Sequence, residues 1–195
     1  RNQAFGVSVL SANTTGSQNN AFGYGALNNN TTASDNTAFG HIALNANTTG
    51  NYNTAVGATA LDANTTGEVN TSIGFGALSA NTTADGNTAV GVNALNNSTT
   101  GASNSAFGYN SLGQNTTGID NTAIGTYSAY SKTTGSGNTN VGYAAGYDLT
   151  TGSNNLCLGK QAGRTASPSG LLNTDSNVIC LGNNNIAAAY VKVAF

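Results

Sequence analysis

The amino-acid sequence predicts an all-β fold, a β-solenoid (β-helix or β-roll) built from 17-residue coils. The first observation is the strict period itself, since Asn recurs at one constant interval from Asn2 through Asn19 and onward to Asn155. The second is a Gly four residues after each of these Asn residues, preceded each time by a large apolar residue. The third is composition, because 6% of the residues are charged against about 25% in typical soluble domains. Such a period in a charge-poor chain indicates stacked repeats and not disorder.

The repeat has the consensus Asn-Thr-Ala-apolar-Gly-x-x-Ala-Leu-x-x-Asn-Thr-Thr-Gly-x-x, and its positions are numbered 1 to 17 from the first Asn. Ten repeats follow one another without an insertion. Gly, Asn and paired Thr residues are poor helix formers, and the two apolar positions do not follow a period of about 3.6 residues. Short β-branched and aromatic segments between Gly and Asn are typical of strands and turns. Successive coils are therefore expected to stack at about 4.8 Å, with equal positions above one another.

The fixed polar positions have physical roles in such a stack. Stacked Asn side chains at position 1 are expected to form an amide ladder, each bonding the one above and below. The Gly at position 5 is expected at a corner that requires positive φ or close backbone approach. The Asn-Thr-Thr-Gly segment is expected to form the other turn by bonding the local backbone. Structural ladder residues predicted in this way include Asn36, Asn53, Asn70, Gly40, Gly57 and Gly74.

The repeat also predicts that more than one chain takes part. Each 17-residue coil has two large apolar positions, one before the Gly and one four residues after it, usually Leu. That is little apolar surface for ordering a whole coil, so a lone solenoid is under-filled. We expect one apolar column to face the coil interior and the other to face partner chains.

The regularity ends near the C-terminus. The Leu at position 9 becomes Gly146 and Gly163, and six residues are inserted in the stretch 163–177. The last ten residues end with Val191, Val193 and Phe195 in strand-like alternation. The sequence therefore predicts a solenoid over residues 1–162, and an irregular insertion, a last coil and a terminating or transition strand over 163–195.

Candidate chemical groups are few, and we expect no catalytic, metal-binding or cofactor-binding residue. His41 is the one histidine, and its variable position favours a surface residue over a base or ligand. Cys157 and Cys180 occupy position 3 of successive coils, where Ala is usual, which predicts two buried free thiols within disulfide range. No pair of acidic residues fits acid–base catalysis, so the chain is not expected to be an enzyme.

Two further polar patterns have simple explanations. Asn51, Glu68 and Asp85 share position 16 of successive coils, which favours a solvated turn over a weak Ca²⁺ site. Asn-Thr-Thr also matches the N-glycosylation sequon, and turn chemistry explains these sites more simply. The sequon residues are Asn13, Asn30, Asn47, Asn64, Asn81 and Asn115.

Aromatic residues at the variable positions form the candidate binding surface. Rings on a rigid face are platforms for sugars or partner proteins. The alternative is that they pack between chains or against a neighbouring turn. The candidate receptor contacts are Tyr24, Tyr109, Tyr127, Tyr130, Tyr143 and Tyr147.

Charge and hydropathy exclude two classes of partner. The five basic residues are scattered, so no basic stripe follows a nucleic-acid backbone. No apolar run approaches the roughly 20 residues of a membrane helix. We therefore expect neither nucleic-acid binding nor membrane insertion.

The repeat over residues 2–159 resembles the repeats of bacteriophage tail fibres that carry a C-terminal intramolecular chaperone of the endosialidase type. The segment from Val178 to Phe195 resembles the stretch just upstream of that chaperone. This resemblance implies a parallel homotrimeric fibre in the virion that attaches to a host-cell glycan or protein receptor. More distantly, the Asn-x-x-apolar-Gly step resembles the head repeats of trimeric autotransporter adhesins, which have a shorter period. That resemblance implies the head domain of a surface adhesin on a bacterial cell.

Two hypotheses from other classes are less favoured. Paired Thr ladders suggest an ice-binding solenoid, but adjacent Thr residues in a strand point to opposite faces and not to one plane. An enzyme requires a composite site between chains, as in tailspikes that cleave polysaccharide.

Overall fold

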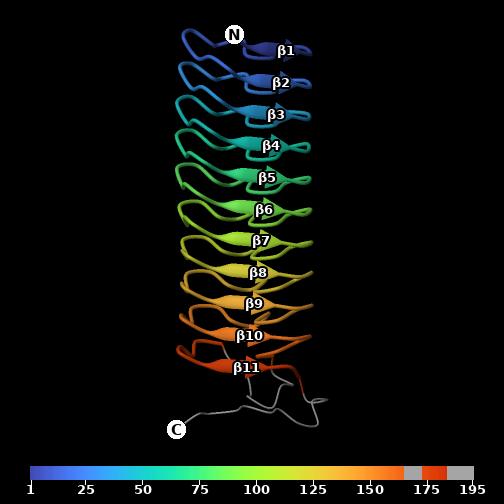
Figure 1. Cartoon of the computed structure of the whole chain (residues 1–195), viewed down its shortest axis with the longest axis vertical. Helices are drawn as coiled ribbons and strands as arrows, with labels where there is room; N and C mark the ends of the chain where they lie inside the picture. The colour runs from blue at the N-terminus through green and yellow to red at the C-terminus, as the bar shows by residue number, and fades with distance from the viewer. Residues whose placement is uncertain (165–172, 184–195) are drawn as a thin grey trace.

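The computed structural model describes residues 1–164 and 173–183, which wind into one β-solenoid (Figure 1). Within these residues there is no helix, and 11 short strands form one parallel sheet in the order β1 to β11. The predicted all-β solenoid of 17-residue coils is thereby confirmed. The strands are β1 (Gln3–Phe5), β2 (Asn20–Phe22), β3 (Thr37–Phe39), β4 (Thr54–Val56), β5 (Thr71–Ile73), β6 (Thr88–Val90), β7 (Ser105–Phe107), β8 (Thr122–Ile124), β9 (Thr139–Val141), β10 (Leu156–Leu158) and β11 (Ile179–Leu181).

The register places each repeat position on the same position of the next coil. Phe5 pairs with Phe22, and Phe22 pairs with Phe39. The regular step continues up to β10, whereas Leu158 pairs with Leu181 across a longer step that contains the inserted segment. The insertion therefore lies between β10 and β11 and leaves their register intact. The expected strand at 191–195 lies outside the described residues.

The core is a narrow column of small and medium side chains. Ala at positions 3 and 8 and Leu at position 9 are fully buried in most coils, as in Ala55, Ala60 and Leu61. The side chain in the middle of each strand from β2 to β11 points inward, because successive strand residues alternate between the two faces. The Leu column is thus the interior one of the two apolar columns that the sequence predicts.

The backbone explains the Gly at position 5. Gly40 has φ +144°, and a Cβ added there would lie 2.5 Å from the carbonyl oxygen of Gly57 in the next coil. Both requirements that the sequence suggested, positive φ and close approach, therefore hold at this corner. Three further positions, 7, 9 and 17, are left-handed with ordinary residues, for example Leu61 at φ 54°. A left-handed Leu is unusual, and complete burial of its side chain offsets the backbone strain.

Two Asn ladders run along the interior, and they differ in chemistry. At position 1, the Asn53 backbone N–H donates to Asn36 Oδ1 at 2.9 Å, and Asn53 Nδ2 donates to the Gly67 carbonyl at 2.8 Å. At position 12, Asn64 Nδ2 donates to Asn47 Oδ1 at 2.9 Å and also to the Gly67 carbonyl at 3.0 Å. Side-chain amides also bond one another at position 1, as where Asn138 Nδ2 donates to Asn121 Oδ1 at 3.0 Å, so the predicted Asn ladder forms there and a second ladder forms at position 12.

The paired Thr residues point in different directions. Thr48 Oγ1 donates to the Thr65 carbonyl at 3.0 Å, so the hydroxyl at position 13 is used within the stack. Thr49 at position 14 is exposed. The pairs thus provide one exposed Thr column and not a plane of two.

Candidate functional site

An exposed apolar column runs the length of the solenoid at position 4. It lies on the outer face of the sheet, because the neighbouring position 3 points into the core. Phe5 and Phe39 are 74% and 57% exposed, and Ile124 in the eighth coil is still 44% exposed. We call this column the apolar stripe; it consists of Phe5, Phe22, Phe39, Val56, Ile73, Val90, Phe107, Ile124, Val141, Leu158 and Leu181.

The aromatic end of the stripe forms a groove. The rings of Phe5 and Phe22 lie 6.4 Å apart, and those of Phe22 and Phe39 lie 5.6 Å apart. Together with Gly23 and Gly40 they line an open, almost wholly apolar groove of about 500 Å³. Since Gly at position 5 has no side chain, the groove floor is backbone beside a wall of rings.

Position 6 adds a second exposed column beside the stripe. The two positions are separated by one Gly, so their Cα atoms are at most about 7 Å apart. Tyr24 stacks on His41 at 5.5 Å between ring centroids, and Tyr109 and Tyr143 are 44% and 48% exposed. His41 therefore lies on the surface, stacked on a tyrosine. The other large exposed apolar residues of this column are Val7, Phe75 and Val92.

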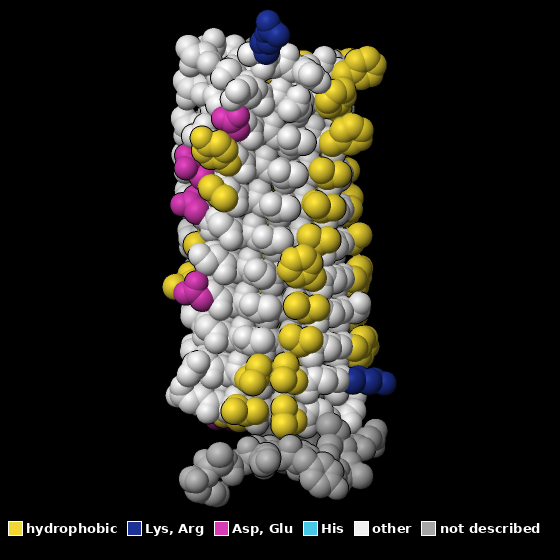
Figure 2. Space-filling view, viewed as in Figure 1, with side chains coloured by type: hydrophobic (Ala, Val, Ile, Leu, Met, Phe, Trp, Pro, Cys, Tyr) yellow, Lys and Arg dark blue, Asp and Glu magenta, His cyan; other side chains and the backbone are white. Residues whose placement is uncertain are grey.

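Charged side chains avoid the stripe. None of its residues is charged, and position 6 has one basic residue, Lys160. The acidic residues occupy positions 10, 11, 15, 16 and 17, among them Glu68, Asp85 and Asp120. Figure 2 shows acidic side chains towards one edge of the rod and a file of hydrophobic side chains down the other. The rod thus has an apolar side and a more hydrophilic side.

Four of the six candidate tyrosines meet in one cluster on coils 7 to 9. Tyr127 makes edge contacts with Tyr109 at 5.3 Å, Tyr130 at 5.6 Å and Tyr147 at 6.2 Å. Tyr130 stacks on Tyr147 at 5.3 Å between centroids. The hydrogen bond with Tyr109 raises the pKa of Tyr127 above its usual value. Tyr24 and Tyr143 lie apart from this cluster, in the position-6 column.

The ring faces in the middle of this cluster are already covered. Tyr130 lies between Gly113, whose added Cβ would approach the ring to 3.1 Å, and Tyr147. The other face of Tyr147 carries the Arg164 guanidinium at 4.5 Å from the ring centroid. Successive coils therefore stack Tyr130, Tyr147 and the Arg164 guanidinium on one another, and the last of these contacts is a cation–π interaction. The two tyrosines offer edges and hydroxyl groups to a ligand, and not open faces.

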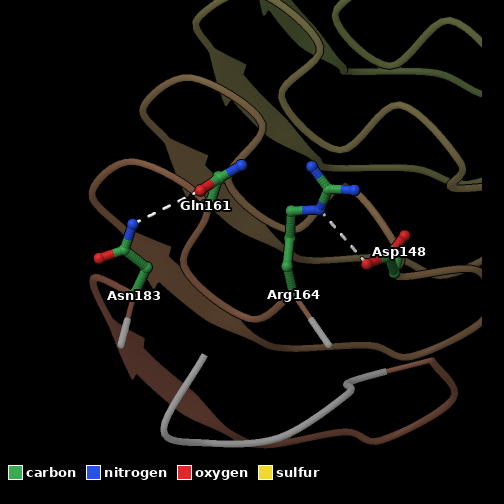
Figure 3. Close-up of polar contacts among 4 residues, drawn as sticks. All are labelled: Asp148, Gln161, Arg164 and Asn183. Atoms are coloured by element: carbon green, nitrogen blue, oxygen red, sulfur yellow. Dashed lines mark hydrogen bonds and ion pairs between the residues drawn. The ribbon is translucent and has the colours of Figure 1, made fainter. Parts of the chain in front are cut away.

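Arg164 is held on this stack by a polar contact. Its Nε lies 3.5 Å from Asp148 Oδ2, and Asn183 Nδ2 donates to Gln161 Oε1 at 3.5 Å one coil further on (Figure 3). These contacts join the last three coils on the outside. Arg164 was not among the residues expected from the sequence, although it occupies position 10, the position of Tyr130 and Tyr147.

A lysine replaces Asn in the interior ladder at coil 8. Lys132 is fully buried, and its Nζ donates to the Gly152 carbonyl at 2.9 Å. Within residues 1–164 and 173–183 the single ion pair joins Arg164 and Asp148, so no carboxylate neutralises this ammonium. Burial lowers the pKa of Lys132 from 10.5 to about 8. Lysine in place of Asn also leaves Asn115 Oδ1 buried, with no hydrogen-bond partner in the part of the chain that the structure describes.

The core around Lys132 is repacked. Leu at position 9 becomes Ala129 and Gly146, while Ala at position 3 becomes Asn140. A Cβ on Gly146 would overlap the Asn140 side chain, so the larger residue occupies space that the smaller one leaves. Both polar side-chain atoms of Asn140 are buried without a partner among the described residues. Aligning the repeats by position would have revealed these exchanges from the sequence.

The two cysteines lie side by side in the core. Cys157 and Cys180 are directly paired on β10 and β11, and both are buried free thiols. Burial, and then the neighbouring Cys180, raise the pKa of Cys157 to about 12. The thiol is therefore a poor nucleophile at neutral pH.

The acidic column at position 16 is used within the turns. Asn51 Nδ2 donates to Glu68 Oε1 at 2.9 Å, and the Glu68 backbone N–H donates to Asp85 Oδ1 at 2.7 Å. Over the part of the chain that the structure describes, no three His, Cys, Asp or Glu residues gather to hold a metal ion. Among the acids, burial raises the pKa of the half-buried Asp62 above its usual value.

The sequon asparagines are interior residues. Five of the six are fully buried, and Asn13 in the first coil is half-buried. Their amides bond the position-15 carbonyl, as Asn115 does with Gly118 at 3.0 Å. A glycan has no space at these sites in the folded rod.

The described residues contain no helix of the length and hydropathy needed to cross a membrane. Comparisons of the chain with protein-family models, with curated proteins and with solved structures found no match. The function must therefore be argued from the chain's own residues and surfaces.

Proposed function

We propose that this chain is a structural and adhesive segment of a bacteriophage tail fibre, in which three copies form a fibre that mediates attachment to host cells. The resemblance of the 17-residue repeat to tail-fibre repeats supports this proposal. The proposed receptor is a glycan or protein of the host-cell surface. We propose no catalytic role.

One observation carries the structural part of the proposal: a single parallel sheet continues through all 11 described strands with unchanged register. At about 4.8 Å per coil, this makes a rod roughly 50 Å long. Every coil bonds the next through the backbone and through the Asn of position 1, as at Asn53, and the first five coils also bond through the Asn of position 12, as at Asn64. Bending such a rod stretches or compresses these bonds at many positions at once, so its stiffness suits a fibre.

The adhesive part of the proposal concerns the variable positions. Tyr130 and Tyr147 lie at position 10, outside the columns at positions 4 and 6, and present edges and hydroxyl groups. Such groups provide both apolar contact and hydrogen bonds to a receptor.

Two measurements test the proposal. Electron microscopy of the purified protein is expected to show uniform rods. Fluorescently labelled protein is expected to bind saturably to particular bacterial strains, and unlabelled protein is expected to compete. Rods that bind no strain in a broad panel would contradict the adhesive role, and compact or irregular particles would contradict the structural role.

A further inference from the structure

We infer that the apolar stripe is the surface on which a second copy of this chain packs, side by side along the rod. This rests on the fibre proposal and deepens it by naming the partner and the surface that copies share. The first argument is that the chain buries one of its two large apolar columns, at position 9, and leaves the other, at position 4, exposed. Phe39 at position 4 is 57% exposed, whereas Leu44 in the same coil is fully buried.

The area of the exposed columns is sufficient for a stable contact. Positions 4 and 6 together expose 13 large apolar side chains, by 36–74% each. At 150–250 Å² for an aromatic side chain, this amounts to on the order of 1,000 Å² per chain. A standard interface needs about 800 Å² from each partner. Monomeric soluble proteins rarely expose apolar patches of this size, which points to a covered surface.

The spacing of the stripe favours a copy of the chain over an unrelated occupant. The stripe offers one apolar side chain per coil, at about 4.8 Å, over 11 strands. A partner that fills every interval must have the same spacing over the same length. A second solenoid of this sequence has that spacing by construction, so side chains of one stripe can pack between those of the other.

Charge distribution points to the same face. The chain has a net charge of -2, and its acidic side chains lie at positions away from the stripe. Contact through the stripe keeps the acidic columns of two copies apart and hydrated. Contact through the opposite side would bring Glu68 and Asp85 of each copy against those of the other, which is unfavourable. The stripe has no basic residue and the neighbouring position 6 has one, Lys160, which argues against an anionic lipid surface as the occupant.

The chain contains a matched control for the test. Ile124 on the stripe and Ile119 on the opposite side are 44% and 43% exposed. Coils 4 and 5 offer a second pair, with Ile73 on the stripe and Val69 away from it. The stripe variant is Ile73→Lys with Ile124→Lys, and the control variant is Val69→Lys with Ile119→Lys. Circular dichroism and thermal unfolding establish that both variants fold.

Sedimentation velocity and native mass spectrometry over a range of micromolar concentrations measure the association. Wild type and the control variant are expected to be oligomers, and the stripe variant is expected to associate at least about 100-fold more weakly, because two ammonium groups are forced into an apolar contact. A monomeric wild type, or equal weakening by the control variant, would overturn the inference. If the stripe variant does not fold, Ile124→Thr, which keeps a β-branched residue in β8, replaces it, with Ile119→Thr as control.

A cross-linking experiment gives an independent answer. In a Cys157→Ala/Cys180→Ala background, Ile124→Cys is expected to give disulfide-linked dimers under mild oxidation, and Ile119→Cys is not. The reverse outcome overturns the inference. The cell-binding assay separates this inference from the proposed function: a monomeric chain that still binds cells refutes the interface alone. Copies that associate through the stripe but bind no cell refute the adhesive role alone.

Discussion

Replacing Lys132 with Met should stabilise the solenoid. The side chain is fully buried, no carboxylate in residues 1–164 or 173–183 pairs with it, and Met has a similar length without the charge. The substitution removes the hydrogen bond from Nζ to the Gly152 carbonyl. That carbonyl keeps a bond from Asn138 Nδ2 at 3.1 Å, so no acceptor is left unpaired.

The magnitude follows from the pKa of Lys132, which burial lowers from 10.5 to about 8. At about 1.4 kcal/mol per pKa unit, holding the protonated side chain in the core costs about 3 kcal/mol at pH 7. Met removes this cost but cannot make the hydrogen bond, so we expect Lys132→Met to raise the free energy of unfolding by about 2 kcal/mol. For a chain of this size the melting temperature should rise by roughly 5 °C.

The pH dependence provides a second, more specific signature. Above pH 8 the folded state loses the Lys132 proton while the unfolded state retains it up to about pH 10.5. The unfolded state then binds more protons, so wild-type stability should rise with pH, by about 1 kcal/mol between pH 8 and 9. The Cys157 pKa, raised from 9.0 to about 12, acts in the opposite direction above pH 9. Between pH 8 and 9 the thiol removes only about 0.4 kcal/mol, so the lysine effect dominates that interval.

Urea unfolding followed by circular dichroism at pH 7, 8 and 9 measures both effects. Lys160→Met, at an exposed position, controls for the loss of one positive charge. We expect the Lys132 variant to be more stable at pH 7 and to lack the rise between pH 8 and 9, and the Lys160 variant to keep that rise. A less stable Lys132→Met protein, or one with an unchanged rise, would refute the burial argument.

Three other substitutions test the architecture by urea unfolding. Gly57→Ala should lower the free energy of unfolding by at least about 2 kcal/mol, because its Cβ would lie 2.6 Å from the Gly74 carbonyl oxygen at φ +134°. Gly86→Ala, at φ +68° with no atom closer to its Cβ than Ser103 Oγ at 3.8 Å, should lower it by about 1 kcal/mol. Equal losses would argue against close coil packing. Asn64→Ala removes three buried hydrogen bonds and should lower the free energy of unfolding by about 2–3 kcal/mol, while exposed Asn29→Ala should change it by less than about 0.5 kcal/mol; a neutral Asn64→Ala would show that the ladder is dispensable. Cys157→Ala with Cys180→Ala restores the usual residue of position 3 and should change stability by less than about 1.5 kcal/mol; a larger loss would show that the thiols fill space that Ala cannot.

The chemistry of individual positions was harder to predict than the fold. The sequence indicated the Asn ladder at position 1, where successive side-chain amides do bond each other, as at Asn121 and Asn138. It did not indicate the second amide ladder, at position 12, where it predicted only a turn. It pointed to tyrosines as a group, but the stacking of Tyr130 between Gly113 and Tyr147 depends on which side chains lie one coil above and below. It did not single out Lys132, although Lys132 occupies position 12, where the Asn side chains of other coils are buried.

The sequence by itself determined the period, the parallel stacking and the register, because a strict 17-residue repeat makes every coil alike and places like residues together. It also determined where the regular step ends, since the insertion lengthens the step between Leu158 and Leu181. Only the tertiary structure decided which apolar column is inside. Gly at position 5 turns the chain so that the left-handed Leu of position 9 enters the core, while Phe, Val and Ile of position 4 remain on the outer face of the sheet. That choice depends on backbone dihedral angles over a whole coil, and it creates the surface on which the proposed assembly depends.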